Sequence, residues 1–455
     1  MKYYSKLVLP LLAISSLQSM ALETENKRPN IILVYCDDLG YGDLGITGHP
    51  HIKTPHIDQM ALSGIRFTNY YSASPASTAS RYAMLTGRYP SRSGFGWVLD
   101  PKSTIGIHSE EQTVAELLKQ QGYATAMYGK WHLGSTKREY LPLQNGFDEY
   151  IGLPYSNDMI PPLYQDIALL NGNDTLEINP DQSKLTKLYT EKALSFIKQN
   201  KKSPFFIYLP YAMPHVPLFP GKNFAGKSKR GAYGDVVEEI DWAMGQIFST
   251  LEQEGIEKNT IVWFISDNGP WILKKEQGGS AGLFKDGKGS TWEGGVRVPC
   301  IAYWPGQIST KINEEVVTAM DVFATNVKLG GASIPGNRVT DGTDLRYYLG
   351  FTNVKEKPQT PYFYCGLQNE VMAVRLGKWK LHIKTFSQIN KDYFSGELPL
   401  LFNLETDPSE NYNLATQYPE IVRQLKTLIN EHLEEIDRTG NDYGVQKSHR
   451  IKERL

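Results

Sequence analysis

Short apolar segments alternate with amphipathic helical segments along most of this chain, and several of the apolar segments end in reactive polar side chains. "NIILVYC" (30–36) and "TIVWFIS" (260–266) have the length and composition of buried strands. "EEQTVAELLKQQG" (110–122) has the spacing of an amphipathic helix that ends at a glycine. Strands that alternate with helices form parallel sheets. The pattern therefore predicts an α/β fold in which helices sandwich a large, mostly parallel sheet.

A longer helix is expected over residues 235–255. Asp235 and Glu238 have the spacing of a capping box, so the helix is predicted to begin there. Val237, Ile240 and Met244 then lie on one face, which we expect to pack against the sheet.

The alternation changes near residue 345, where short strands such as "MAVRLGKWKLHI" (372–383) take over. A helix follows over residues 419–436, and its inward face is expected to contain Val422, Leu425, Ile429, Leu433 and Ile436. These segments predict a small C-terminal α+β subdomain with an antiparallel sheet and one helix. The predicted organisation is a signal peptide at 1–21, a catalytic α/β domain at 22–345 and a C-terminal subdomain at 346–455.

The N-terminal segment has the order of a secretory signal. Lys2 and Lys6 precede an apolar run over residues 7–17, and small residues end at Ala21, where cleavage is expected. The run is too short to cross a bilayer. The segment predicts an exported protein, periplasmic or secreted, without stable membrane insertion.

Composition excludes several classes of protein. The formal net charge of -1 gives no electrostatic reason to expect nucleic acid as a partner. Cys36, Cys300 and Cys365 are far apart and odd in number, so no disulfide framework is predicted. The 9 histidines include no HExxH motif, which argues against a zinc hydrolase of that type.

Reactive side chains follow four of the predicted strands. Ligands of open α/β sheets bind at the carboxyl ends of the strands, so these side chains are predicted to form one polar site. They are Asp37, Asp38, Lys130, His132, His215, Asp267 and Asn268. The carboxylate and amide oxygens among them suit a hard cation such as Ca²⁺ or Mg²⁺.

A glycine-rich loop at 282–296 contains Lys288. Its spacing of Gly282, Gly287 and Lys288 resembles a phosphate-binding loop of the Walker type. Gly289 stands where that loop requires Ser or Thr, so a Walker loop is not predicted. Lys288 is predicted to contact an anion, whereas Lys285 is predicted to be an exposed loop residue.

The segment Ser77-Thr78-Ala79-Ser80-Arg81, followed by "LTGR" (85–88), resembles the signature of formylglycine-dependent sulfatases. Further segments match the same family in order along the chain. They are "RPNIILVYCDDLGYGDLG", "YGKWHLG", "PHVP", "ISDNG", "KGSTWEGGVRVP" and "LFNLETDPSENYNLA". The chain thus resembles the type I sulfatases, which include the arylsulfatases and belong to the alkaline phosphatase superfamily.

The resemblance implies a role for each matched position. It implies formylglycine (3-oxoalanine) at residue 77 and one Ca²⁺ held by Asp37, Asp38, Ser77, Asp267 and Asn268. Arg81 and Lys130 would hold the modified residue, and His132 would assist its turnover. Lys130, His215 and Lys288 would bind the sulfate.

The chemistry of formylglycine agrees with these roles. A hydrated aldehyde offers a more acidic hydroxyl than serine does as the nucleophile. After attack at sulfur, its second hydroxyl allows sulfate to leave by elimination, which restores the aldehyde. Cationic side chains oppose the charge that builds up on the sulfate oxygens, and a protonated His215 would give a proton to the departing alcohol.

The chain departs from the family pattern at residue 77, where most members have cysteine. Ser77 favours a serine-type sulfatase matured before export by a formylglycine-generating enzyme, and an engineered Cys-to-Ser change is the other reading. Two alternatives remain open: a phosphomonoesterase or phosphodiesterase of the same superfamily, and a non-catalytic binder of sulfated glycans. Export and abundant aromatic residues favour a sulfated carbohydrate as the substrate.

Overall fold

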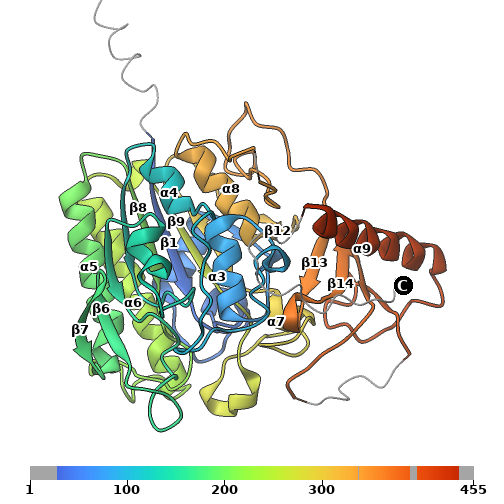
Figure 1. The fold of residues 1–455 in the computed structure, drawn as a ribbon, viewed down its shortest axis with the longest axis horizontal. Coiled ribbons are helices and arrows are strands. Elements are labelled where there is room, and N and C mark those ends of the chain that lie inside the picture. Colours follow the sequence, from blue (N-terminus) through green and yellow to red (C-terminus); the bar gives the residue numbers. More distant parts are fainter. Residues whose placement is uncertain (1–27, 337, 390–396, 440–455) are drawn as a thin grey trace, which may run out of the picture.

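The computed structural model describes residues 28–336, 338–389 and 397–439. A ten-stranded mixed sheet forms its centre, and a four-stranded antiparallel sheet lies beside it (Figure 1). In spatial order, the strands of the large sheet are β11 (Lys311–Asn313), β2 (Ile65–Phe67), β10 (Cys300–Tyr303), β9 (Thr260–Ser266), β1 (Asn30–Cys36), β8 (Phe205–Pro210), β4 (Ala124–Tyr128), β5 (Glu149–Gly152), β6 (Ala168–Asn171) and β7 (Asp174–Ile178).

The middle of the large sheet is parallel, as the sequence predicts. β9, β1, β8, β4 and β5 run in the same direction, whereas β10 pairs antiparallel with β9, and β6 and β7 form an antiparallel edge. A pair of two-residue strands, β3 (Tyr70–Tyr71) and β12 (Val317–Thr318), lies outside it. The predicted α/β class is confirmed.

Helices cover both faces of the large sheet because successive residues of β1 point to opposite sides. Ile31 and Leu33 belong to one core, with α3, α4 and α8, whereas Ile32 and Val34 belong to the other, with α2, α5 and α6. The helices are α2 (Pro55–Ser63), α3 (Ser77–Thr86), α4 (Val114–Lys119), α5 (Leu185–Asn200), α6 (Ala232–Gln253), α7 (Glu293–Val296), α8 (Ala319–Leu329) and α9 (Pro419–Thr439).

The smaller sheet and α9 form the C-terminal α+β part that the sequence predicts. Its strands, in order, are β13 (Tyr362–Cys365), β14 (Val371–Leu376), β15 (Trp379–His382) and β16 (Leu400–Asn403). Side chains of this sheet join the core on the α3 and α8 side of the large sheet. The domain boundary at residue 345 stays a prediction, and the predicted signal peptide lies outside the described residues.

Three details of the sequence prediction are wrong. α6 begins at Ala232 rather than at Asp235, whose carboxylate instead accepts hydrogen bonds from three backbone N–H groups, including that of Gly226. Leu433 is 37% exposed, and the neighbouring His432 takes the buried position on α9. Lys285 is partly buried, because its ammonium lies over the Trp292 ring.

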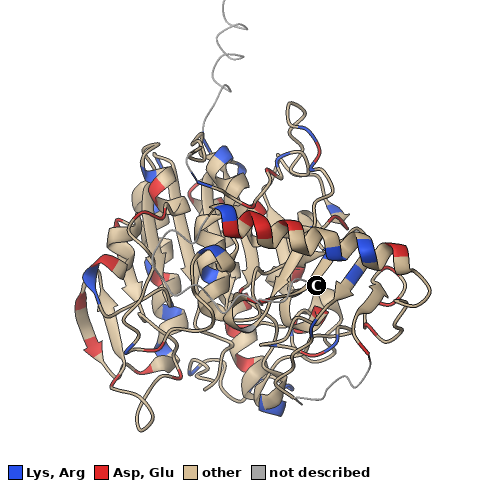
Figure 2. Ribbon diagram, turned by 45° about the vertical axis from the view of Figure 1, so that its right-hand side comes forward, with Lys and Arg blue, Asp and Glu red and all other residues tan. Residues whose placement is uncertain are grey.

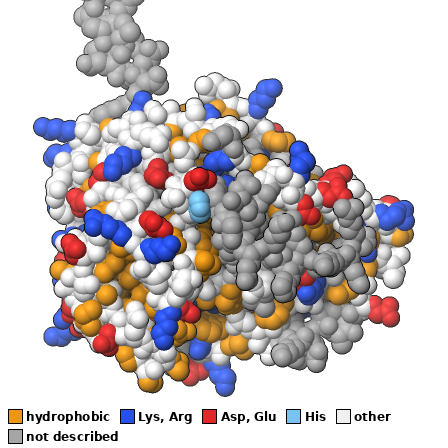
Figure 3. Space-filling view, viewed as in Figure 1, with side chains coloured by type: hydrophobic (Ala, Val, Ile, Leu, Met, Phe, Trp, Pro, Cys, Tyr) orange, Lys and Arg blue, Asp and Glu red, His pale blue; other side chains and the backbone are white. Residues whose placement is uncertain are grey.

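The surface carries charges of both signs. Figure 2 shows Lys and Arg interspersed with Asp and Glu, in keeping with the net charge of -1. On the face seen in Figure 3, charged side chains of both signs lie among polar and apolar ones. In the described part of the chain, no helix is both long and apolar enough to cross a membrane.

β1 contributes side chains to both cores. Leu33 in β1 is fully buried, so Leu33→Ala should lower the free energy of unfolding by about 2–5 kcal/mol through lost burial and a cavity. Denaturant unfolding measures this loss. Leu62→Ala in α2 is the matched control, because Leu62 is 59% exposed and should cost less than about 0.5 kcal/mol. Equal losses in the two variants would contradict this account of the core.

Candidate active site

The parallel pairing of β1 and β9 brings four polar residues together. Cys36 lies opposite Ser266 at the last register position, so the residues that follow both strands emerge side by side. The backbone N–H of Asp267 donates to the Cys36 carbonyl at 3.0 Å, and that of Asp38 donates to Asp267 Oδ1 at 3.0 Å. Asp37 and Asn268 are adjacent to this contact, and all four polar side chains are buried.

Ser77 faces this group from the N-terminus of α3. The helix begins at Ser77 itself, with Ala76 as its N-cap residue. Ser77 Oγ donates to Asp37 Oδ1 at 3.0 Å and lies 3.4 Å from Asn268 Oδ1. The first backbone N–H groups of a helix favour negative charge nearby, so an anionic oxygen at residue 77 would be stabilised.

The donor set fits a hard cation. Oxygen atoms converge from three carboxylates, one amide and one hydroxyl, namely those of Asp37, Asp38, Asp267, Asn268 and Ser77. Calcium and magnesium prefer such all-oxygen sites. In the described part of the chain, one group of acidic and histidine side chains has its ligand atoms within 4.8 Å of one another. It consists of Asp37, Asp38 and His215, so one ring nitrogen also lies near these oxygens.

Two buried cations offset part of the negative charge. Arg81 Nη2 lies 2.8 Å from Asp267 Oδ2 and 3.5 Å from Asp37 Oδ1. Lys130 Nζ lies 2.5 Å from Asp37 Oδ2 and 3.1 Å from Ser156 Oγ. Because unpaired charges are costly in a protein interior, each cation stabilises the carboxylate it contacts.

The acidic residues respond differently to this setting. Burial raises the pKa of Asp37, but Lys130, His215 and Arg81 outweigh burial and hold that pKa well below its usual range. Burial and the nearby Asp37 carboxylate raise the pKa of Asp267 to about 7. A divalent cation bound among these carboxylates would offset the repulsion between Asp37 and Asp267.

Lys288 and His215 meet at Asp38. Lys288 Nζ lies 2.8 Å from both carboxylate oxygens of Asp38, and His215 Nε2 lies 3.6 Å from Oδ2. Burial lowers the pKa of Lys288, but Asp38 outweighs it and raises that pKa, so the ammonium stays charged. His215 Nδ1 is held 2.5 Å from the Val216 carbonyl, which leaves Nε2 to face the polar site.

His132 is adjacent in sequence to the site but makes a different contact. Its Nε2 lies 2.8 Å from the Leu99 carbonyl, and its Nδ1 is buried without a hydrogen-bond partner. Burial and the nearby Lys130 charge lower the pKa of His132, so the ring is neutral. One ring nitrogen is therefore available for a further polar group.

The structure adds two residues to the predicted site. Ser156 follows β5, and its Oγ accepts a hydrogen bond from the Lys130 ammonium, so the rule about strand ends could have identified it. Trp271 has its ring 4.8 Å from Lys288 Nζ and 5.6 Å from the His215 ring. Trp271 follows "SDNGP" in a turn, where the sequence carries no signal for it.

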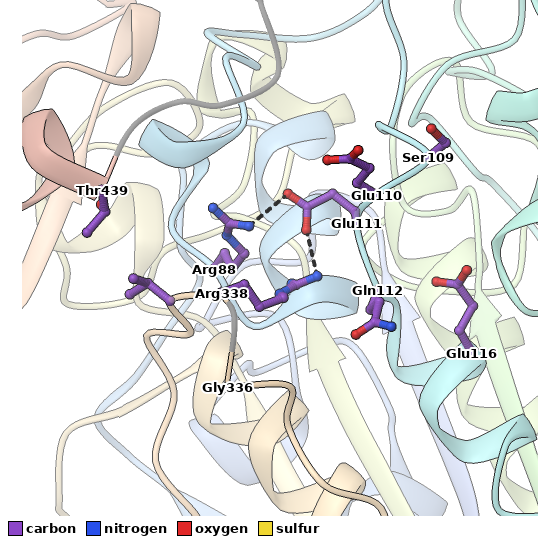
Figure 4. Close-up of a pocket in the computed structure, with 10 residues that line it drawn as sticks. Arg88, Ser109, Glu110, Glu111, Gln112, Glu116, Gly336, Arg338 and Thr439 are labelled. Carbon is purple, nitrogen blue, oxygen red and sulfur yellow. Dashed lines mark ion pairs between the residues drawn. The ribbon is translucent and has the colours of Figure 1, made fainter.

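A separate polar cavity of about 780 Å³ lies beyond the other end of α3 (Figure 4). Within it, the Glu111 carboxylate pairs with Arg88 at 3.3 Å and with Arg338 at 2.9 Å. Arg88 comes eleven positions after Ser77 along a mostly helical segment, which corresponds to roughly 15 Å. The cavity is therefore distinct from the site at Ser77.

Comparisons with known proteins agree with this geometry. Residues 29–332 match the model of the sulfatase family, and residues 356–453 match the C-terminal region of aryl-sulfatase. N-acetylgalactosamine-6-sulfatase of Mus musculus is 37% identical, over 93% of this chain and 89% of its own length.

Two solved sulfatase structures are similar over nearly the whole chain. PsFucS1 sulfatase from Pseudoalteromonas sp. superposes with a TM-score of 0.84 at 28% identity, covering 94% of both chains. Ps i-CgsB in complex with k-i-k-neocarrahexaose superposes with a TM-score of 0.76 at 29% identity, covering 92% of this chain and 94% of its own. The chain therefore belongs to the sulfatase family and is a sulfuric ester hydrolase.

Proposed function

We propose that this enzyme removes sulfate from a sulfated carbohydrate, using formylglycine formed from Ser77 and one Ca²⁺. The observation that carries the proposal is the convergence of Ser77 Oγ on Asp37 at 3.0 Å, beside the Lys288 ammonium 2.8 Å from Asp38. A nucleophile position, a cluster of oxygen ligands and anion-binding cations thus lie within one buried site.

The proposed calcium ion would be held by Asp37, Asp38, Asp267, Asn268 and residue 77. When bound, it would lower the pKa of the nearby hydroxyl and oppose negative charge on the sulfate. Formylglycine would supply a hydrated aldehyde as the nucleophile, in place of the weakly acidic serine hydroxyl.

The protein's own side chains would orient the sulfate. Lys130 and Lys288 present buried ammonium groups that can contact sulfate oxygens. Arg81 pairs with the Asp267 carboxylate and keeps it in place. His215 Nε2 would carry the proton that passes to the ester oxygen as its bond to sulfur breaks. His132 would use its free Nδ1 to help restore residue 77.

Relatives support a carbohydrate leaving group. The mouse relative is named for N-acetylgalactosamine 6-sulfate, and the Ps i-CgsB structure contains a neocarrahexaose. Export to the periplasm or beyond, after conversion of residue 77 by a maturase, is part of the proposal. The predicted signal at residues 1–21 lies outside the described residues.

The proposal predicts release of sulfate from sulfated galactose or N-acetylgalactosamine oligosaccharides, measured as free sulfate across a panel of defined sulfation positions. Lys288→Ala and His215→Ala should each lower kcat by about 10²–10³, as expected when one transition-state contact is lost. Circular dichroism shows whether both variants fold. Near-normal turnover in either variant would refute that residue's role, and preferential hydrolysis of matched phosphate esters would favour the phosphatase alternative.

Formylglycine at residue 77 predicts a specific mass change. The tryptic peptide that contains Ser77 should lose two hydrogens, about 2 Da, and should react with a hydrazide. Ser77→Ala, produced in the same host, is the matched control and should show neither change. An unchanged peptide from a host that modifies serine-type sulfatases would favour a non-catalytic glycan binder.

Calcium is predicted to stabilise the folded protein. Elemental analysis should find one calcium per chain, and EGTA should lower both the activity and the Tm. Binding at 100 times Kd contributes about 2.7 kcal/mol. EGTA already saturated with calcium is the matched control and should have no effect. Two tightly bound zinc ions per chain would contradict the sulfatase assignment of this site.

A further inference from the structure

A second group of buried charges lies between α7 and the C-terminal sheet. This group, the Glu293 cluster, consists of Glu293 in α7, Lys380 and His382 in β15, and Glu410 in the loop that follows β16. All four side chains are fully buried. Figure 1 shows α7 beside the C-terminal sheet, so the cluster joins two parts of the chain that are far apart in sequence.

The cluster is tightly paired. Lys380 Nζ lies 3.0 Å from Glu293 Oε1 and 2.8 Å from Glu410 Oε1, and His382 Nε2 lies 2.7 Å from Glu410 Oε1. Burial raises the pKa of Glu293, but Lys380 and neighbouring arginines outweigh burial and hold that pKa well below its usual range. Buried pairs of this kind are costly to break, because the remaining partner keeps its charge without compensation.

Two hydrogen bonds connect the cluster to the loop that carries Lys288. Lys380 Nζ donates to the Thr291 carbonyl at 2.9 Å, three residues after Lys288. Glu410 Oε2 accepts from the backbone N–H of Glu293 at 2.7 Å, which fixes the end of the same loop. The C-terminal sheet therefore binds the backbone of this loop directly.

The same loop contacts the segment that leads to Ser77. The Gly289 N–H donates to the Pro75 carbonyl at 2.9 Å, two residues before Ser77. Tyr362 in β13 donates its hydroxyl to the Ser72 carbonyl at 2.5 Å. Backbone contacts thus connect the Lys288 loop to the segment before Ser77, and the C-terminal sheet contacts both.

Glu410 adopts an unusual backbone conformation. Its φ is 55°, in the left-handed region that residues other than glycine and asparagine seldom occupy. Such a conformation persists where the surroundings determine it strongly. Its two carboxylate oxygens here accept from Lys380, His382 and the Glu293 backbone.

From these contacts we infer that Lys380 and Glu410 are positioning residues for Lys288. They hold residues 288–293 so that the Lys288 ammonium points at Asp38 and at the sulfate. The inference rests on the proposed role of Lys288 in sulfate binding. Lys380 and Glu410 themselves touch no reacting atom.

A double-mutant cycle tests this inference. Glu410→Gln keeps the size of the side chain and removes its charge, and it should raise the inhibition constant for inorganic sulfate and lower kcat/KM by roughly 10- to 100-fold. In the Lys288→Ala background the same change should have little further effect, because Glu410 acts through Lys288. Effects that simply multiply would overturn the inference.

Glu435→Gln is the matched control. Glu435 in α9 pairs with Arg92 at 2.7 Å and so joins the same two parts of the chain, but away from the Lys288 loop. It should leave the inhibition constant for sulfate near that of the unmodified enzyme in both backgrounds. If Glu410→Gln leaves the inhibition constant for sulfate as unchanged as Glu435→Gln does, the cluster only stabilises the fold and the inference fails.

Two further results separate the possible failures. If Lys288→Ala alone leaves sulfate inhibition and turnover unchanged, the proposed function of Lys288 fails before the positioning question arises. If Glu410→Gln does not fold, Lys380→Arg replaces it in the cycle. This variant keeps the charge but changes the geometry at Thr291, so it should give the same non-multiplying pattern.

Discussion

The site depends on the parallel register of β1 and β9. Cys36 and Ser266 pair at the ends of these strands. The residues that follow them, Asp37 and Asp267, therefore lie next to each other in the interior. Two neighbouring carboxylates repel each other and destabilise the folded protein unless cations lie beside them. The cations come from other elements, with Arg81 from α3 and Lys288 from the glycine-rich loop. The register of the sheet thus brings the carboxylates together, and cationic side chains from other elements compensate their charge.

The Lys288 loop is rich in glycine, so contacts from elsewhere in the chain are needed to hold it in one conformation. Gly289 has a φ of 86°, which favours glycine, and its N–H bonds to the Pro75 carbonyl. A loop of this composition loses much conformational entropy when it is ordered. Two hydrogen bonds hold this loop in place: Lys380 donates to the Thr291 carbonyl, and Glu410 accepts from the Glu293 N–H.

The sequence was sufficient to predict the parts of the site that depend on local pattern. Buried strands followed by Asp37-Asp38 and Asp267-Asn268 can be read from hydrophobic runs and a general rule about strand ends. The start of α6 at Ala232 could not be predicted, because the Asp235 carboxylate accepts from the loop that precedes the helix rather than from the first turn of the helix itself. The Glu293 cluster was missed for a different reason: its members lie on elements far apart in the sequence, and no local spacing links them.

The charge of the buried site also constrains what it can bind. Three carboxylates follow β1 and β9, and three cationic side chains face them, namely Arg81, Lys130 and Lys288. The polypeptide alone therefore supplies little net attraction for an anion. A calcium ion held by the proposed oxygen ligands would leave a net charge of two positive units, which would attract the anionic sulfate ester. Anion binding and cation binding would then be coupled, because each makes burial of the other less costly.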